Sequence, residues 1–358
     1  MSVRRGIGLA LTLVVLVLVA PTLIDVYSSV GDAFRQPVGW LVVIVGLSFA
    51  QFACAWALLR VVLRTDSWLA VAAPQLGGNL ASHVVPMGTA AGAGVQVSMQ
   101  ITAGTPVGTV LTGLSASSLL GAAAGFVALP LVVLAGTAIG GEVDSALLAP
   151  MWVATAVLAA ALVAIVVLVH RDRPWRLAAG AVVWVQGKRH RLVDRDELER
   201  RFLGERDMLL DTMAEHGPFI VVVSIANPLL DYLCLLACLH AAGADVNPGA
   251  ALAAYIVSNV AGLIPLTPGG LGFVEAGLQG TLTLAGATSS SASLAVATYR
   301  LAVTWLPCIA AAPAYVVFRR RFGKKSHDVS IEGELVRPDG EPGGPAPREE
   351  RTCPPTPP

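Results

Sequence analysis

The chain alternates between long apolar stretches and short polar connections. The stretches with almost no charge are residues 7–24, 38–63, 107–135, 146–169, 216–242 and 290–318. A helix needs about 20 apolar residues to cross the hydrocarbon core of a bilayer, and these stretches have about that length or more. The pattern therefore predicts an all-α, polytopic membrane protein.

The composition agrees with this class. Of the 358 residues, 55% are hydrophobic and only 13% are charged, whereas a soluble domain carries about 25% charged residues. The formal net charge is zero, so no basic surface points to a nucleic-acid partner. The cysteines form no metal-ligand pattern, and we expect neither a metal nor another cofactor.

Basic residues in the connections predict the orientation, because they concentrate on the cytoplasmic side of membrane proteins. They cluster before the first span, after the second, within 170–206 and after the last span, whereas 25–37, 136–145 and 243–249 carry mostly carboxylates. Both termini are therefore predicted to be cytoplasmic. The excess of Arg over Lys, with abundant Ala and Val, indicates a GC-rich bacterial genome, so the expected location is the bacterial cytoplasmic membrane.

The first apolar run needs a comparison with a signal peptide. Pro21 follows Ala20 and would hinder cleavage there, and the run continues through Ile24. We therefore interpret it as a retained first span.

Two stretches do not fit single spans. Residues 68–104 begin on the cytoplasmic side and must return to it, and residues 249–287 begin outside and must return there. Each has a central break rich in Pro and Gly, at Pro86-Met87-Gly88 and at Pro265 to Gly270. Irregular backbone at membrane depth is tolerated only where protein or a wet cavity satisfies its polar groups. Both are interpreted as helical hairpins that enter from opposite faces, either re-entrant or fully spanning.

An internal similarity supports this plan. A shift of 180 residues aligns 38–85 with 218–265 without a gap and pairs Asn79 with Asn259. Because the two copies have opposite predicted orientations, we predict two inverted repeats, a plan that transporters use with the substrate site near the midplane. The predicted segments are 1–37 (first span and outer loop), 38–135 (repeat 1), 136–215 (a span and cytoplasmic interfacial helices), 216–322 (repeat 2) and 323–358 (a disordered cytoplasmic tail).

The cytoplasmic part of the third segment predicts a lipid contact. Residues 171–191 combine an apolar run, which contains Trp175 and Trp184, with a basic cluster from Lys188 to Arg191. This combination is typical of an interfacial helix on an anionic lipid surface.

Four polar or ionisable residues lie within the predicted spans and hairpin of the second repeat. They are Asp231, Asn259, Glu275 and Arg300. A charge at the bilayer centre costs about 2.5–3.5 kcal/mol on insertion scales, so such residues indicate function. Arg300 lies ten residues into the last span, about 15 Å deep at the helical rise. We expect all four side chains to meet near the midplane.

Two interpretations of these residues stay open. In the first, Glu275 and Arg300 form a buried ion pair that only holds the hairpin in place. In the second, Arg300 binds a phosphate oxygen with its planar set of donors, while Glu275 or Asp231 meets a cation or a proton. The break would then add backbone N–H donors at a helix N-terminus, where the dipole favours an anion. The glycines concerned are Gly269, Gly270 and Gly272.

The first hairpin offers weaker candidates. Asn79 and His83 lie near its break, and His83 is either a headgroup ligand or a hydrogen-bonded structural histidine. The aqueous segments contain no Ser-His-Asp set, phosphate loop or metal cluster. We therefore expect that the protein is not an enzyme.

The stretch from Asn259 to Arg321 resembles the lysylphosphatidylglycerol synthase transmembrane family, known from the bacterial multiple peptide resistance factor and its stand-alone relatives. The motif PGGLG-x-x-E is matched by Pro268 to Gly272 with Glu275, and the intramembrane arginine by Arg300. The resemblance implies a flippase-like domain that moves a lipid between leaflets, classically an aminoacylated phosphatidylglycerol.

Two departures limit that implication. The family's first hairpin often has a Pro-x-Arg-x-Gly-Glu signature, and this chain has Pro86-Met87-Gly88 there. The soluble aminoacyl-transferase domain is not present, so we expect no lipid synthesis by this chain. The expected function is movement of a phosphate-headed lipid or lipid-linked carrier between leaflets. The alternatives are a scaffold subunit for a lipid-modifying or glycosyl-transferring enzyme and an ion-coupled small-solute transporter. A partner enzyme and a homo-oligomer both stay open.

Overall fold

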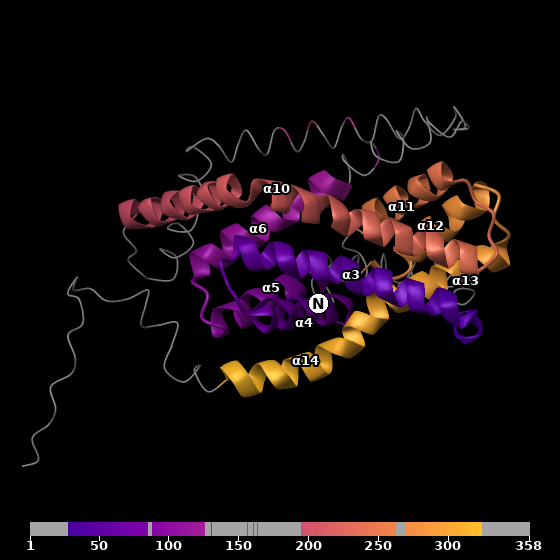
Figure 1. The fold of residues 1–358 in the computed structure, drawn as a ribbon, viewed down its shortest axis with the longest axis horizontal. Helices are drawn as coiled ribbons and strands as arrows, with labels where there is room; N and C mark the ends of the chain where they lie inside the picture. Colours follow the sequence, from indigo (N-terminus) through magenta and orange to yellow (C-terminus); the bar gives the residue numbers. More distant parts are fainter. Residues whose placement is uncertain are drawn as a thin grey trace, which may run out of the picture.

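The computed structural model describes residues 28–84, 88–125, 195–262 and 270–323, together with Pro130, Ala156, Ala160 and Val163. Every regular element among these residues is a helix (Figure 1). The helices are α2 (Val30–Ala33), α3 (Val38–Val62), α4 (Trp68–Val84), α5 (Gly88–Thr102), α6 (Val107–Ala123), α10 (Arg195–Ala241), α11 (Pro248–Gly262), α12 (Phe273–Leu284), α13 (Ser289–Arg300), the π-helical turn η3 (Leu301–Trp305) and α14 (Leu306–Phe322).

Among the described residues, three helical segments are long and apolar enough to cross a bilayer. They are Val38–Val62, Ala214–Ala241 and Ser289–Phe322, with mean hydropathies of 2.1, 2.1 and 1.8. These segments expose large apolar side chains such as Phe49 and Val222, which is costly in water and favourable in lipid. The prediction of an all-α, polytopic membrane protein is confirmed.

Several predicted elements lie outside the described residues. They are the span at 7–24, nearly all of the span at 146–169, the interfacial helix at 171–191 and the tail beyond Gly323. The span predicted at 107–135 is represented by α6, which is apolar but has only 17 residues. The inverted relation of the two repeats and the division of the chain into five segments stay predictions.

The end of the predicted segment 136–215 and the predicted span at 216–242 form one long helix, α10. This helix is kinked at His216, whose φ of −112° and ψ of 15° are not helical. Pro218 follows two residues later, and a proline lacks the N–H of the helical hydrogen bond and clashes with the carbonyl four residues earlier. The kink therefore separates the polar part of α10 from its membrane-length part.

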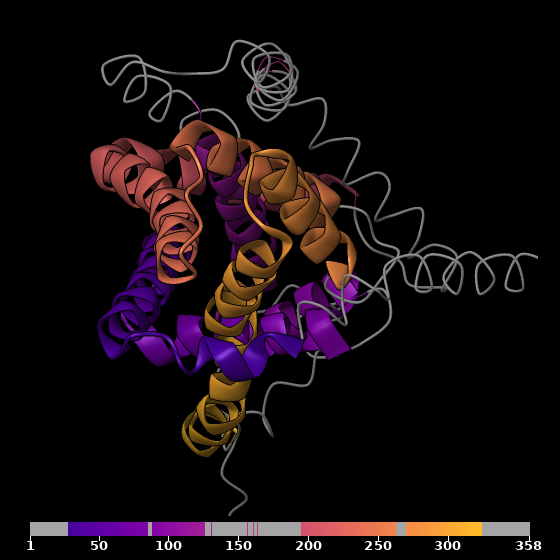
Figure 2. The same cartoon turned by 90° about the vertical axis from the view of Figure 1, so that its right-hand side faces the viewer.

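The helices α3 and α10 pack side by side along the long axis of the molecule (Figure 1). In the end-on view of Figure 2, the last helical segment passes between the other helices and its yellow end, α14, projects beyond them, with α3 and α10 on one side. Contacts of α13 with α10 and of α14 with α4 agree with this placement. The last helical segment thus touches both the first and the second half of the chain.

Each of the two predicted hairpin stretches contains a pair of packed helices, α4 with α5 and α11 with α12. The first pair approaches closely at glycines. A Cβ on Gly92 would clash with the carbonyl oxygen of Gly78, and one on Gly78 would lie 2.9 Å from that of Gly92. Only glycine permits this approach, as is common between membrane helices. The connecting residues 85–87 and 263–269 lie outside the described residues.

The largest cluster of buried apolar residues lies in the second half of the chain. Leu235 of α10, Leu252 of α11 and Leu282 of α12 are fully buried there and pack with many alanines of α11 and α13. Lipid is as apolar as leucine, so close van der Waals packing between small and large side chains stabilises this cluster. Glu275 and Arg300 lie on α12 and α13, two of the helices that form this cluster.

Replacing Leu282 with Ala should lower the free energy of unfolding by about 2–4 kcal/mol, because it leaves a cavity in a packed core. Leu284, on the same helix, is 91% exposed, so Leu284→Ala is the matched control and should unfold like the original protein. The check is the midpoint of denaturation by sodium dodecyl sulfate in mixed micelles. Equal midpoints for the two variants would contradict the packing described for α12.

Candidate functional site

The start of α12 holds the carboxylate of Glu275 in place. Gly270 and Gly272 have φ values of +68° and +91°, in the left-handed region that favours glycine. Gly272 is the N-terminal cap, and its backbone N–H donates to Oε2 of Glu275 at 2.7 Å. The carboxylate also lies at the positive end of the helix dipole.

Arg300, the last residue of α13, pairs with this carboxylate. Its Nε donates to Oε1 of Glu275 at 2.7 Å, and the side chains of Arg300 and Glu275 are only 9% and 0% exposed. Its Nη1 donates to Oγ1 of Thr304 at 3.1 Å. Its Nη2 is buried and has no hydrogen-bond partner among the described residues. The Nη2 group of the guanidinium therefore makes no hydrogen bond to the described residues.

These bonds change the expected role of the Gly-rich break. Gly272 was expected to offer its N–H to a bound anion, but that N–H is taken by Glu275 of the same helix. The negative charge at this helix N-terminus is thus supplied by the protein itself. Gly270 provides the turn before α12, and Gly269 lies outside the described residues.

Asp231, on α10, is held by two tyrosines. The hydroxyl of Tyr255 donates to Oδ2 and that of Tyr299 donates to Oδ1, each at 2.9 Å. The side chain of Gln51 also interacts with this carboxylate. Because Tyr299 precedes Arg300, neighbouring residues of α13 contact the half-buried carboxylate of Asp231 and the buried one of Glu275.

A cavity of about 550 Å³, whose wall is rich in polar side chains, lies between α3, α4, α5, α10 and η3, and we call it the central cavity. Its polar wall residues are Gln51, Gln75, Asn79, Ser82, His83, Thr89, Gln96, Asn227, Asp231 and Thr304. So many polar groups are unfavourable at membrane depth unless they face water or a polar ligand. Thr304 connects the wall to Arg300 behind it.

Two of the weaker candidates, Asn79 and His83, line this cavity. Nδ1 of His83 lies 2.8 Å from the carbonyl oxygen of Asn79, one turn earlier on α4. A carbonyl only accepts, so Nδ1 donates the hydrogen bond and Nε2 is left as an acceptor. His83 is therefore hydrogen-bonded within its own helix and still borders the cavity.

The meeting of four side chains stays a prediction for Asn259, which the structure does not place on the central cavity. Its side chain is exposed, and its Nδ2 donates to the carbonyl oxygen of Tyr255 at 2.9 Å. The amide thus turns back on α11 and does not line the central cavity. Asp231 lines the cavity, whereas Glu275 and Arg300 form their pair next to it.

Sequence reasoning missed Gln51 and Asn227 as cavity residues. Asn227 donates from Nδ2 to the backbone carbonyl of Gln51 at 2.8 Å, and both line the cavity. The repeat alignment contained a signal for Gln51, since the shift of 180 residues pairs it with Asp231. Gln51 and Asp231 lie together where α3 packs on α10.

With this geometry established, the chain can be compared with known proteins. The family model of the lysylphosphatidylglycerol synthase TM region matches residues 6–311. The match covers most of the chain, so the protein belongs to this family, and the predicted family is confirmed. A comparison with curated proteins finds no match.

Removing one partner of the buried pair should strongly destabilise the protein. Glu275→Gln leaves the guanidinium of Arg300 without its counter-charge, which costs about 3–5 kcal/mol of unfolding free energy. The control is Arg35→Gln, which breaks an exposed pair with Asp32 and should leave stability unchanged. Denaturation midpoints in mixed micelles check both. A Glu275→Gln protein as stable as the control would contradict the buried pair.

Proposed function

We propose that this protein moves a phosphate-headed lipid, or a lipid-linked carrier, between the two leaflets of the membrane. The observation that carries the proposal is the different character of the two sides of the α4–α5 helix pair. One side lines the central cavity, whose wall is rich in polar side chains, and the other lines a mostly apolar cavity of about 810 Å³ against α14. A lipid has these two parts, a polar head and apolar chains.

The central cavity has the chemistry for a phosphate head. Amide groups of Gln96 and Asn79 line it, and Arg300 lies behind Thr304 with its Nη2 unused. A guanidinium donor shielded from water binds phosphate oxygens strongly. The carboxylate of Asp231, on the same cavity, suits a proton or a cation that accompanies the phosphate.

The apolar cavity suits acyl or polyprenyl chains. Leu80, Val95 and Met99 of the helix pair face Ala311 and Tyr315 of α14 across it. Arg319 lies at the same cavity and marks its polar end. A small hydrophilic solute would have no use for such a surface, so this cavity favours a lipid substrate over a small solute.

The location and orientation are part of the same proposal. We place the protein in a bacterial cytoplasmic membrane with both termini in the cytoplasm, on the basis of the basic connections. The activity is non-enzymatic and needs no cofactor. A lipid-modifying enzyme would be a partner that supplies or receives the lipid.

Purified protein in liposomes should exchange a fluorescent phospholipid between leaflets faster than empty liposomes do. Gln96→Leu and Asn79→Leu should each slow this exchange roughly tenfold or more, because the phosphate loses a hydrogen-bond donor of the cavity wall. The rate is read from the fraction of label that dithionite reaches over time. Ser118→Ala is the control, since Ser118 is exposed on α6, bonds to the carbonyl of Leu114 in its own helix and lines neither cavity. No exchange above empty liposomes with several headgroups would refute the proposed function.

Arg300→Lys tests the role of the guanidinium apart from the ion pair. Lysine keeps a positive charge beside Glu275 but lacks the planar set of donors. We expect a folded protein with exchange slowed at least roughly tenfold. Melting temperature and exchange rate are measured on the same preparation. A folded Arg300→Lys protein with the original exchange rate would show that Arg300 is purely structural.

A further inference from the structure

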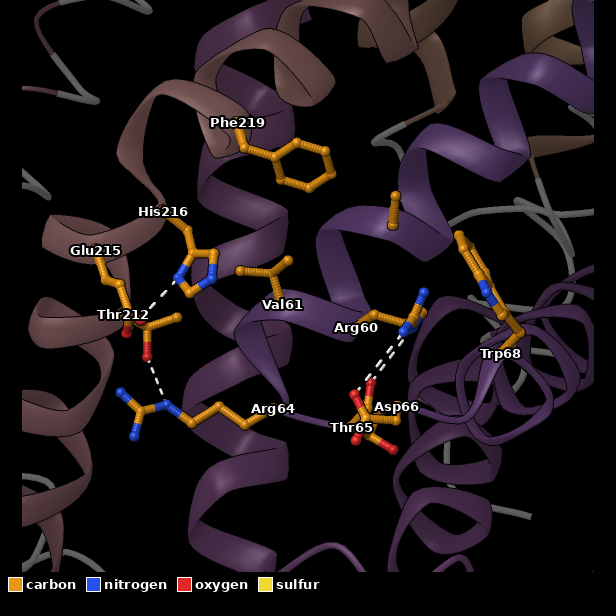
Figure 3. Close-up of a pocket in the computed structure, with 11 residues that line it drawn as sticks. Arg60, Val61, Arg64, Thr65, Asp66, Trp68, Thr212, Glu215, His216 and Phe219 are labelled. Carbon is orange, nitrogen blue, oxygen red and sulfur yellow. Dashed lines mark hydrogen bonds and ion pairs between the residues drawn. The ribbon is translucent and has the colours of Figure 1, made fainter.

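A second pocket, of about 470 Å³, lies where α3 ends and α10 bends, and we call it the interface pocket. Figure 3 shows its wall between these two helices. Its main wall residues are Arg60, Arg64, Trp68, Thr212, His216 and Phe219. None of the described residues lines both this pocket and the central cavity. The two are separate sites.

The interface pocket lies at the level of lipid headgroups. The membrane-length segment Val38–Val62 ends at it, and the segment Ala214–Ala241 begins at it. Trp68 and Phe219 are each about half exposed on its wall. Aromatic side chains are enriched at the boundary between hydrocarbon and water. Both observations place the pocket where the phosphates of one leaflet lie.

Arg64 occupies a position that normally favours glycine. Its N–H bonds to the carbonyl of Val61, and the N–H of Thr65 bonds to that of Arg60, which together form the C-terminal motif of α3. Arg64 has a φ of +48°, in the left-handed region that is strained for a side chain as large as arginine. Such strain is kept where the side chain itself is needed.

The two arginines lie at different parts of the same pocket. Arg64 extends toward α10, where its Nε donates to Oγ1 of Thr212 at 2.8 Å, and Arg60 extends toward Trp68 (Figure 3). The guanidinium carbon of Arg60 lies 4.4 Å from the centre of the Trp68 ring, a cation–π contact. The ring orients the guanidinium without neutralising its charge.

The carboxylates at this pocket do not neutralise Arg60. Asp66 lies 3.9 Å from it with a fully exposed side chain, whereas the side chain of Arg60 is only 28% exposed. Glu215 is also exposed and lies 3.8 Å from Nδ1 of His216 on α10. Exposed, loosely placed ion pairs are weak because water and salt screen them. An anion that enters the pocket can therefore compete with both carboxylates.

We propose that the interface pocket binds the phosphate group of an anionic phospholipid from the leaflet around it. Arginine is the side chain best suited to phosphate oxygens, and the half-exposed Trp68 and Phe219 suit the glycerol and the first carbons of the chains. The bound lipid contacts α3 and α10 together. At the helical rise, Gln51 lies about 14 Å from Arg60 along α3, and Asp231 lies about 18 Å from Phe219 along α10. The bound lipid thus contacts the two helices that carry these central-cavity residues. The proposal does not depend on lipid transport.

The test is native mass spectrometry of the full chain in detergent with defined lipids added. Phosphatidylglycerol is compared with a galactosyl diacylglycerol, which has similar chains and no phosphate. The original protein and the control Arg35→Gln should retain phosphatidylglycerol at least roughly tenfold more tightly than the galactolipid. Arg60→Gln should reduce this preference, and Arg60→Gln with Arg64→Gln should lose one retained phosphatidylglycerol. Gln96→Leu, altered in the central cavity, should keep that lipid.

The outcomes separate the sources of phosphate and the two sites. Displacement of the lipid by millimolar inorganic phosphate supports recognition of the phosphate group alone, whereas retention against phosphate supports recognition of the intact lipid. Equal retention of both lipids by the original protein would overturn the proposal. So would an unchanged preference in Arg60→Gln, which loses only weak contacts and so should fold even if the double variant does not. Loss of the lipid in Gln96→Leu but not in the arginine variants would assign it to the central cavity.

Discussion

The pairing of Glu275 with Arg300 is the interaction on which the second half of the protein depends. Each charge alone would be costly inside a bilayer, and together they remain costly unless their other hydrogen-bonding groups are also satisfied. Gly272 and Thr304 supply two of those partners, so a cap of α12, the end of α13 and the turn η3 are fixed relative to one another. The buried core of α10, α11, α12 and α13 then packs around a defined geometry. The remaining donor of Arg300 is the part of the guanidinium that this geometry does not use.

Much of the fold could be predicted from the sequence because the bilayer imposes simple rules. A span must be apolar over its whole length, so the stretches at 38–63, 216–242 and 290–318 were visible as membrane-length helices. The rarity of charge in such stretches also singled out Glu275 and Arg300. The kink at His216 was not anticipated, because the proline that causes it is compatible with a helix boundary as well as with a bend.

The central cavity was harder to predict, because its wall is made largely of amides and hydroxyls. Gln51 and Asn227 carry no charge, so they did not stand out in stretches that were recognised by their lack of charge. The direction of Asn259 depends on the rotation of α11 about its axis, which a nearly uniform apolar helix does not reveal in its sequence. The tyrosine partners of Asp231 come from two other helices, so no local pattern indicates them. The sequence thus predicted where the helices lie in the chain, but it did not predict which side of each helix faces the cavity.

The π-helical turn η3 gives the last segment a register that a regular helix would not have. Its wider turn leaves the carbonyl of Ala302 available, and Ser48 of α3 donates to it at 2.8 Å. Removing one residue from this turn would rotate everything after it by about 100° relative to α13. The side of α14 that packs on α4 would then face elsewhere, while the ion pair of Arg300 stayed where it is. The number of residues in this turn therefore determines the orientation of α14. We expect natural variants to carry substitutions in this segment more often than insertions or deletions.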